Sequence, residues 1–175
     1  MKKLLFVLFT VLISCKSKQE AVTKQDVTIA SKSKNPNHKE LKEFQGDTLK
    51  YVQTKILDRK EYYIGKKFEV LLNDLNIPIE RFMYTPNFNN IKKVSNTIFE
   101  IYDGFETSRK LEKGEIPVNI IITWQTPLNA DEVDKLIIDR TKRAEWTPEK
   151  EAYFKQQIVG NVVRTNYNLE NYKKK

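Results

Sequence analysis

The clearest pattern along the chain is an apolar stripe at helical spacing. Its four members recur three or four positions apart: Phe68, Leu71, Leu72 and Leu75. This spacing places them on one face of a helix, which Asn76 and Pro78 end. A weaker stripe precedes it and consists of Leu49, Val52, Ile56 and Leu57. It predicts a first helix from the N-cap residue Asp47 to about Lys60.

Three later segments have the residue patterns of strands: 79–84, 97–102 and 118–124. In the second, Ile98 and Glu100 lie opposite Thr97 and Phe99. In the third, the face of Val118, Ile120, Ile122 and Trp124 lies opposite that of Asn119, Ile121, Thr123 and Gln125. Such alternation indicates an antiparallel sheet with one packed face and one partly wet face. The thirteen residues between Asp103-Gly104 and Val118 predict a longer loop rather than a tight hairpin.

Two helices are expected to close the chain. The first begins at Asn129 with Glu132 as a capping residue, and its buried face comprises Val133, Leu136, Ile137 and Ala144. The second begins at Thr147-Pro148. It is expected to continue through Gly160 because apolar residues recur at helical spacing: Phe154, Ile158, Val159, Val162 and Val163.

The expected fold is therefore α+β: two N-terminal helices, a small three-stranded antiparallel sheet and two C-terminal helices. Between residues 47 and 124 this layout resembles small outer-membrane-assembly lipoproteins of the BamE type. That resemblance implies a helix-helix-sheet domain on a lipid tether. It covers the order of elements only, and the last fifty residues have no counterpart in it.

The chain begins with a short positive segment and an apolar run, residues 4–13. A membrane-spanning helix needs roughly 20 apolar residues, so the run has the length of a signal peptide. The sequence Leu12-Ile13-Ser14-Cys15 resembles the lipobox of bacterial lipoproteins. The resemblance implies cleavage between Ser14 and Cys15 and lipid attachment to Cys15. An ordinary secretory peptide with a chance cysteine is the alternative.

Lys16 follows that cysteine, where many lipoproteins retained at the inner membrane have aspartate. Within the lipoprotein resemblance, the absence of aspartate implies delivery to the outer membrane. The expected location is therefore the cell envelope, with the protein lipid-anchored at the outer membrane of a Gram-negative bacterium. The predicted organisation is thus a removed signal peptide (1–14), a disordered basic tether (15–45) and a single α+β domain (46–175).

The distribution of charge narrows the range of partners. The formal net charge is +8, but residues 46–172 hold nineteen basic and nineteen acidic side chains. The excess lies in the signal peptide, in the tether and in the last three lysines. A basic tether suits attraction to an anionic membrane surface, whereas a neutral domain argues against nucleic acid as a partner.

Few residues offer catalytic or metal-binding chemistry. The only histidine, His38, lies in the predicted tether, and the only cysteine is the predicted lipid-attachment residue. The two serines of the domain, Ser95 and Ser108, belong to no recognisable motif. No catalytic residue, metal site or cofactor is therefore predicted. A catalytic pair of carboxylates in a cleft remains an alternative, because the domain has nineteen acids and the sequence does not tell which of them meet in space.

Aromatic residues are the remaining candidates for contacts. Phe99 and Trp124 are expected in the core. Tyr62, Tyr63 and Phe88 lie in or beside breaks between elements, which makes them possible exposed binding aromatics. The leading hypothesis is a non-enzymatic lipoprotein that binds an envelope protein or glycan. The alternatives are a small carboxylate-dependent enzyme acting on carbohydrate or peptidoglycan, and a structural spacer or immunity-type protein.

Overall fold

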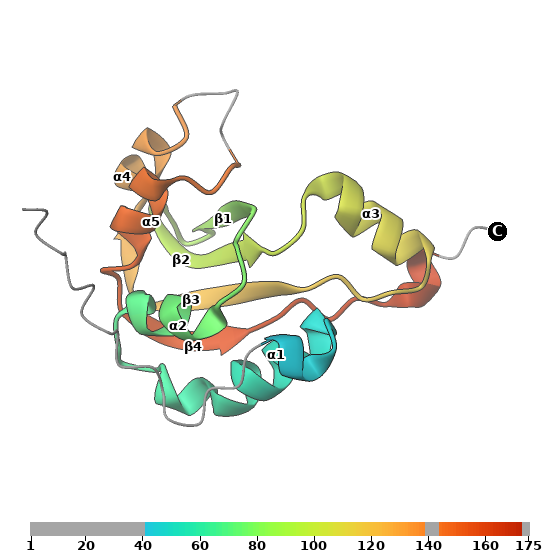
Figure 1. Cartoon of the computed structure of the whole chain (residues 1–175). Helices are drawn as coiled ribbons and strands as arrows, with labels where there is room; N and C mark the ends of the chain where they lie inside the picture. Colours follow the sequence, from blue (N-terminus) through green and yellow to red (C-terminus); the bar gives the residue numbers. More distant parts are fainter. Residues whose placement is uncertain (1–40, 139–143, 173–175) are drawn as a thin grey trace, which may run out of the picture. The chain divides into compact units, whose positions relative to one another are not determined.

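The computed structural model describes residues 41–138 and 144–172. They form an α+β fold with one antiparallel sheet in the order β1-β2-β3-β4 (Figure 1). The strands are β1 Arg81–Asn87, β2 Asn90–Glu100, β3 Asn119–Asn129 and β4 Val159–Val163. The α-helices are α1 Thr48–Lys55, α2 Phe68–Leu75, α3 Gly104–Glu112, α4 Ala130–Lys135 and α5 Pro148–Phe154. Short 3-10 helices are η1 Leu41–Phe44, η2 Leu57–Tyr62 and η3 Leu169–Tyr172.

The N-terminal helices confirm much of the prediction. Helix α2 spans the predicted stripe and ends at Asn76, whose φ of 47° is left-handed. Asp47 caps α1 by accepting a hydrogen bond from the Lys50 amide at 2.9 Å. The first helix is nevertheless shorter than predicted, because η2 replaces its second half. Residues 41–44, which were predicted to belong to the tether, form η1, and the Phe44 ring packs edge-on against Tyr51 at 5.4 Å.

The central connection and the first C-terminal helix differ from the prediction. The expected loop after Asp103 contains helix α3, because the Asp103 side chain accepts from the Glu106 amide at 2.7 Å. Helix α4 is only six residues long. Asn129 caps it as predicted, but Glu132 instead accepts a hydrogen bond from the Tyr153 hydroxyl at 3.3 Å. Ala144 lies outside α4 and accepts from the Phe82 amide of β1.

The largest departure is the fourth strand. The predicted last helix does begin at the Thr147 cap, but it ends at Phe154. The residues that follow pair with β3 as strand β4, which adds a strand to the three that were predicted. The helix prediction for residues 155–163 is therefore wrong.

A β-bulge explains this error. Trp124 pairs with Val159 and Thr123 with Asn161, so Gly160 is an extra residue in the ladder. Strict alternation is lost at that point. As a result the two buried valines of β4, Val159 and Val162, stand three positions apart. That separation imitates the spacing of a helix face.

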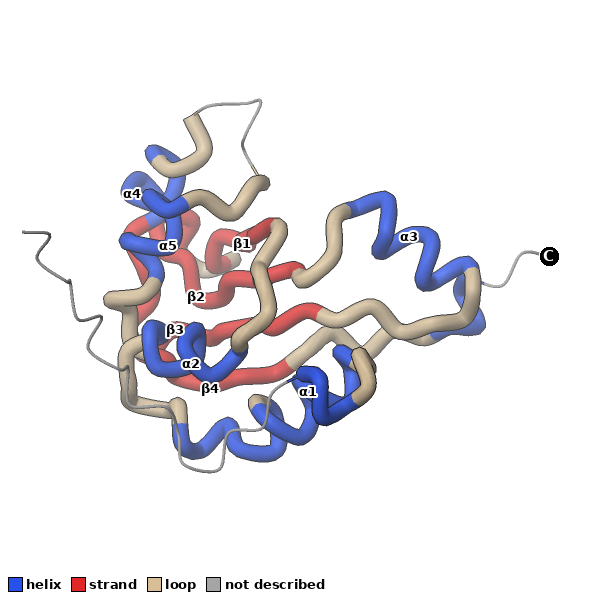
Figure 2. The backbone as a smooth tube through the Cα atoms, in the orientation of Figure 1, coloured by secondary structure: helices blue, strands red, loops and turns tan. Residues whose placement is uncertain are grey.

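The core lies between one face of the sheet and the helices, and we call that face the core face. Phe99 of β2 is fully buried there and stacks on Phe68 of α2, with ring centroids 4.7 Å apart. Trp124 of β3 stacks on Phe154 of α5 at 5.8 Å. The core positions predicted for Phe99 and Trp124 are thus confirmed. Figure 2 shows α4 and α5 at one end of the strands and α3 beyond the other end.

Candidate functional site

The opposite face of the sheet, here called the open face, keeps its side chains in contact with solvent. Its centre is an aliphatic row that crosses all four strands: Met83, Ile98, Ile121 and Val163. Their Cα atoms are direct cross-strand partners. Met83 is 41% exposed and Val163 38%, and the two isoleucines between them are partly buried. Apolar side chains in register on a wet face form a ridge that a partner could cover.

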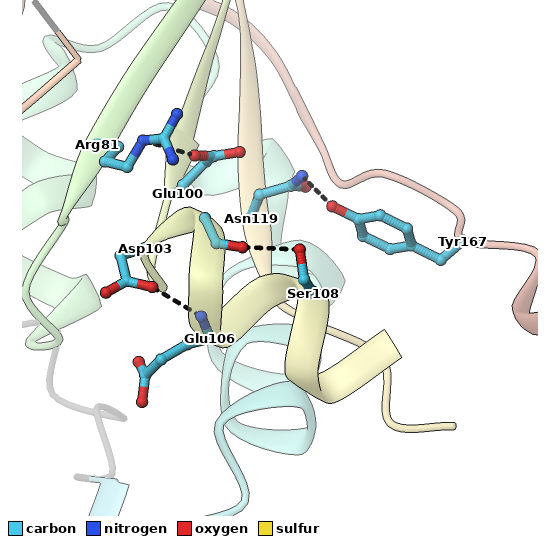
Figure 3. Close-up of polar contacts among 8 residues, drawn as sticks. Arg81, Glu100, Asp103, Glu106, Ser108, Asn119 and Tyr167 are labelled. Atoms are coloured by element: carbon cyan, nitrogen blue, oxygen red, sulfur yellow. Dashed lines mark hydrogen bonds and ion pairs between the residues drawn. The ribbon is translucent and has the colours of Figure 1, made fainter. Parts of the chain in front are cut away.

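A polar row, Arg81, Glu100 and Asn119, borders the aliphatic row on one side. Figure 3 shows these side chains near α3. In this first polar row Arg81 Nε lies 3.4 Å from a carboxylate oxygen of Glu100. Asn119 continues the row, and its side-chain amide donates to Thr165 Oγ1 at 2.8 Å and to the Tyr167 hydroxyl at 3.3 Å. Its one cation and one anion neutralise each other, so this row adds no net charge to the face.

Burial raises the pKa of two groups here, Glu100 in the row and Tyr167 beside it. Desolvation raises the pKa of the Glu100 carboxyl above its ordinary value, and the Arg81 guanidinium opposes that shift. Desolvation also raises the pKa of the Tyr167 hydroxyl, and the negative charge of Glu100 adds to the effect. Both shifts follow from burial, which disfavours the charged form of each group.

A second polar row borders the aliphatic row on its other side. It consists of Thr85, Asn96, Thr123 and Asn161, which are again cross-strand partners. The Thr123 hydroxyl donates to Asn96 Oδ1 at 2.7 Å. The row carries hydroxyl and amide groups and no charge. The open face therefore has an aliphatic centre between two hydrogen-bonding borders, and its overall charge is neutral.

The three aromatic residues predicted to bind a partner differ in their exposure to solvent. Tyr63 is fully buried, so its expected exposure is wrong. Its hydroxyl donates to Asp74 Oδ2 at 3.1 Å, and burial raises its pKa. Tyr62 is 40% exposed, but the Lys66 ammonium lies over its ring, 3.2 Å from the centroid. Phe88 is 95% exposed, at the tip of the hairpin formed by β1 and β2.

Other candidate chemistry can also be located. A hollow of about 450 Å³ runs along β1 past Met83, Tyr84 and Pro86, and none of the described residues that line it is a carboxylate. Glu43 and Asp47 share a smaller surface depression of about 400 Å³, where Asp47 already serves as the cap of α1.

Two further findings, on metal sites and on membrane-spanning helices, concern residues 41–138 and 144–172. No group of three or more potential ligand side chains within those ranges could hold a metal ion. None of the helices described there is both long and apolar enough to cross a bilayer. The predicted cleavage residues Ser14 and Cys15, and His38, lie outside the described residues.

Comparison of the chain with protein-family models, with curated proteins and with solved structures finds no match. The fold and its open face therefore define only a class: an α+β domain with helices on one face of a four-stranded antiparallel sheet. The alternation within β2 and β3 was predicted, but the sequence did not align the faces of different strands. Val163 was missed because its segment resembled a helix.

Proposed function

We propose that the chain is a non-enzymatic binding protein of the cell envelope whose open face docks a protein partner. The observation that carries this proposal is the aliphatic row between two polar rows. Protein interfaces combine an apolar centre with a hydrogen-bonding rim in the same way. The surface would stand free at the outer membrane if Cys15 carries lipid, as the lipobox resemblance implies.

The side chains of the open face favour protein over other classes of partner. Glycan sites commonly use exposed aromatic rings, and the three rows contain none. Nucleic acid requires a cationic surface, whereas Arg81 is the only cation of the rows and is paired with Glu100. A neutral face with an aliphatic ridge fits a partner that presents its own apolar side chains between hydrogen-bonding groups.

The test is site-specific cross-linking followed by a direct affinity measurement. A photoreactive residue in place of Ile98 should capture one envelope protein, and the same residue in place of Phe105 on α3 should not. The captured protein is then purified, and its affinity for Ile121→Ser and Phe105→Ser variants is compared with wild type. We expect Ile121→Ser to weaken binding about tenfold or more, equivalent to about 1.4 kcal/mol. Equal binding by the two variants would contradict the proposal.

Lipid anchoring needs a separate test. Intact mass and membrane partitioning are compared between wild type and Cys15→Ala. We expect acyl mass and membrane association in wild type only, because two or three acyl chains hold a protein stably in a bilayer. Loss of anchoring with intact partner binding would separate the lipoprotein prediction from the proposed role of the open face.

A further inference from the structure

The tip of the β1–β2 hairpin, residues 87–93, exposes two large apolar side chains. Phe88 is 95% exposed and Ile91 is 75% exposed. The turn that presents them is held by its own hydrogen bonds. Asn87 accepts from the Asn89 amide at 2.8 Å and donates to Ser95 Oγ at 2.9 Å. The apolar side chains are therefore presented by an ordered turn.

The hairpin is also cationic. The β1–β2 hairpin contains one acid, Glu100, which pairs with Arg81, and three basic residues in all. Two of them, Lys92 and Lys93, directly follow Ile91 and are exposed. Within residues 41–138 and 144–172, neither lysine forms an ion pair. Both charges are thus available to an anionic partner.

Helix α3 provides a contrasting exposed aromatic. Phe105 is 77% exposed, but it lies between Gly104 and Glu106, beside the cap residue Asp103. Figure 2 places α3 beyond the end of the sheet opposite α4, and Lys93 pairs with Asn129 at the start of α4. An exposed ring therefore occurs at both ends of the sheet. The basic residues of α3, Arg109 and Lys110, pair with Glu106 and Glu115, whereas Lys92 and Lys93 at the hairpin tip form no ion pair with the described residues.

We propose that the hairpin tip contacts an anionic lipid surface. Phe88 and Ile91 enter the interfacial region, where aromatic and aliphatic side chains are favoured. Lys92 and Lys93 pair with headgroup phosphates. The acids Asp131 and Glu132 of α4 follow Asn129 in the chain, so the contact is confined to the end of the hairpin. The aliphatic row crosses the strands away from this tip, which leaves the open face accessible to a protein.

The test uses the full chain reconstituted in vesicles that contain brominated phosphatidylcholine, with and without phosphatidylglycerol. Variants Phe88→Trp and Phe105→Trp are compared, and the emission of wild type is subtracted to remove Trp124 and Trp146. We expect a blue shift and loss of most of the added emission for Phe88→Trp in anionic vesicles. The matched control, Phe105→Trp, should keep its emission. Both probes report on the same anchored protein, so the comparison is independent of what attaches the chain.

A second set of variants tests the role of charge. Adding Lys92→Ser and Lys93→Ser to Phe88→Trp should restore most of the lost emission, as should vesicles without phosphatidylglycerol. Equal quenching of Phe88→Trp and Phe105→Trp would overturn the proposal. Quenching that survives both the serine substitutions and the neutral vesicles would also overturn it. An unquenched Phe88→Trp that cross-links to a protein would assign the tip to a protein partner instead.

Discussion

The two faces of the sheet are formed by the same strands but differ in how far their apolar side chains are buried. Phe99 and Ile98 are neighbours on β2, yet Phe99 is enclosed by α2 and α5 while Ile98 remains partly in water. Apolar area contributes to folding in proportion to the area removed from water. The core face therefore supplies stability, and the open face retains apolar area that a partner can still bury.

A truncation on each face tests this difference most strongly. Phe99→Ala removes a ring that contacts Phe68, Trp124 and Phe154, and should lower the free energy of unfolding by about 3–5 kcal/mol. Ile98→Ala should lower it by about 1 kcal/mol, because part of that side chain is already hydrated. Urea unfolding of the two variants measures both values. Similar losses would mean that the open face is packed in the folded protein.

A substitution in the bulge tests how the fourth strand is held. A Cβ on Gly160 would lie 2.9 Å from the Gln125 amide nitrogen and 3.0 Å from the Trp124 carbonyl carbon. Both neighbours are backbone atoms, which cannot move aside as a side chain can. Gly160→Ala should therefore lower the free energy of unfolding by about 1–3 kcal/mol. Asn161→Ala, one residue further on the open face, is the control and should cost less in the same urea assay.

This bulge is also the reason that the fourth strand could not be predicted from the sequence. The α+β class, helix α2 and the caps Asp47, Asn129 and Thr147 follow from local chemistry, and the structure has them. The two faces of β2 and β3 follow from alternation. Local patterns do not reveal cross-strand register, however, and the bulge at Gly160 gave β4 the apolar spacing of a helix. The aliphatic row could not be assembled without that fourth strand.

Helix α3 and Tyr63 show two other limits. Asp103-Gly104 follows the predicted strand 97–102 and indicates its end, but Asp103 also caps the helix that follows. Tyr63 was expected to be exposed because it stands in a break between helices. Its hydroxyl instead has buried partners in Asp74 and the Lys55 carbonyl oxygen. A break in secondary structure therefore does not by itself place a side chain in water.

Two threonines on opposite faces provide an isosteric comparison. Thr97 is buried and accepts a hydrogen bond from Trp124 Nε1 at 2.9 Å, so Thr97→Val leaves a buried indole N–H unpaired. We expect it to lower the free energy of unfolding by about 1–3 kcal/mol. Thr123→Val breaks the solvent-exposed bond to Asn96 and should change stability by about 0.5 kcal/mol or less. The reverse order, measured by urea unfolding, would contradict the assignment of the faces.

The smallest effect is expected from the titration of Glu100 at the border of the open face. Its pKa in the folded protein is raised by desolvation. The protonated carboxyl therefore contributes stability below the ordinary pKa of 4.5, and this contribution is lost as the pH rises through the raised value. The free energy of unfolding of Glu100→Gln should thus rise relative to that of wild type between about pH 4 and pH 7.

Exposed Glu115 is the control of opposite sign. Its pKa is lowered by the hydrogen bond from Lys110 and by the charge of that lysine. Its contribution to stability is present above the ordinary pKa and is lost as the pH falls. The free energy of unfolding of Glu115→Gln should therefore fall relative to that of wild type over the same rise in pH. Urea unfolding at both pH values measures the two slopes. Slopes of the same sign would show that desolvation does not raise the pKa of Glu100, which would contradict its assignment as a partly buried group at the border of the open face.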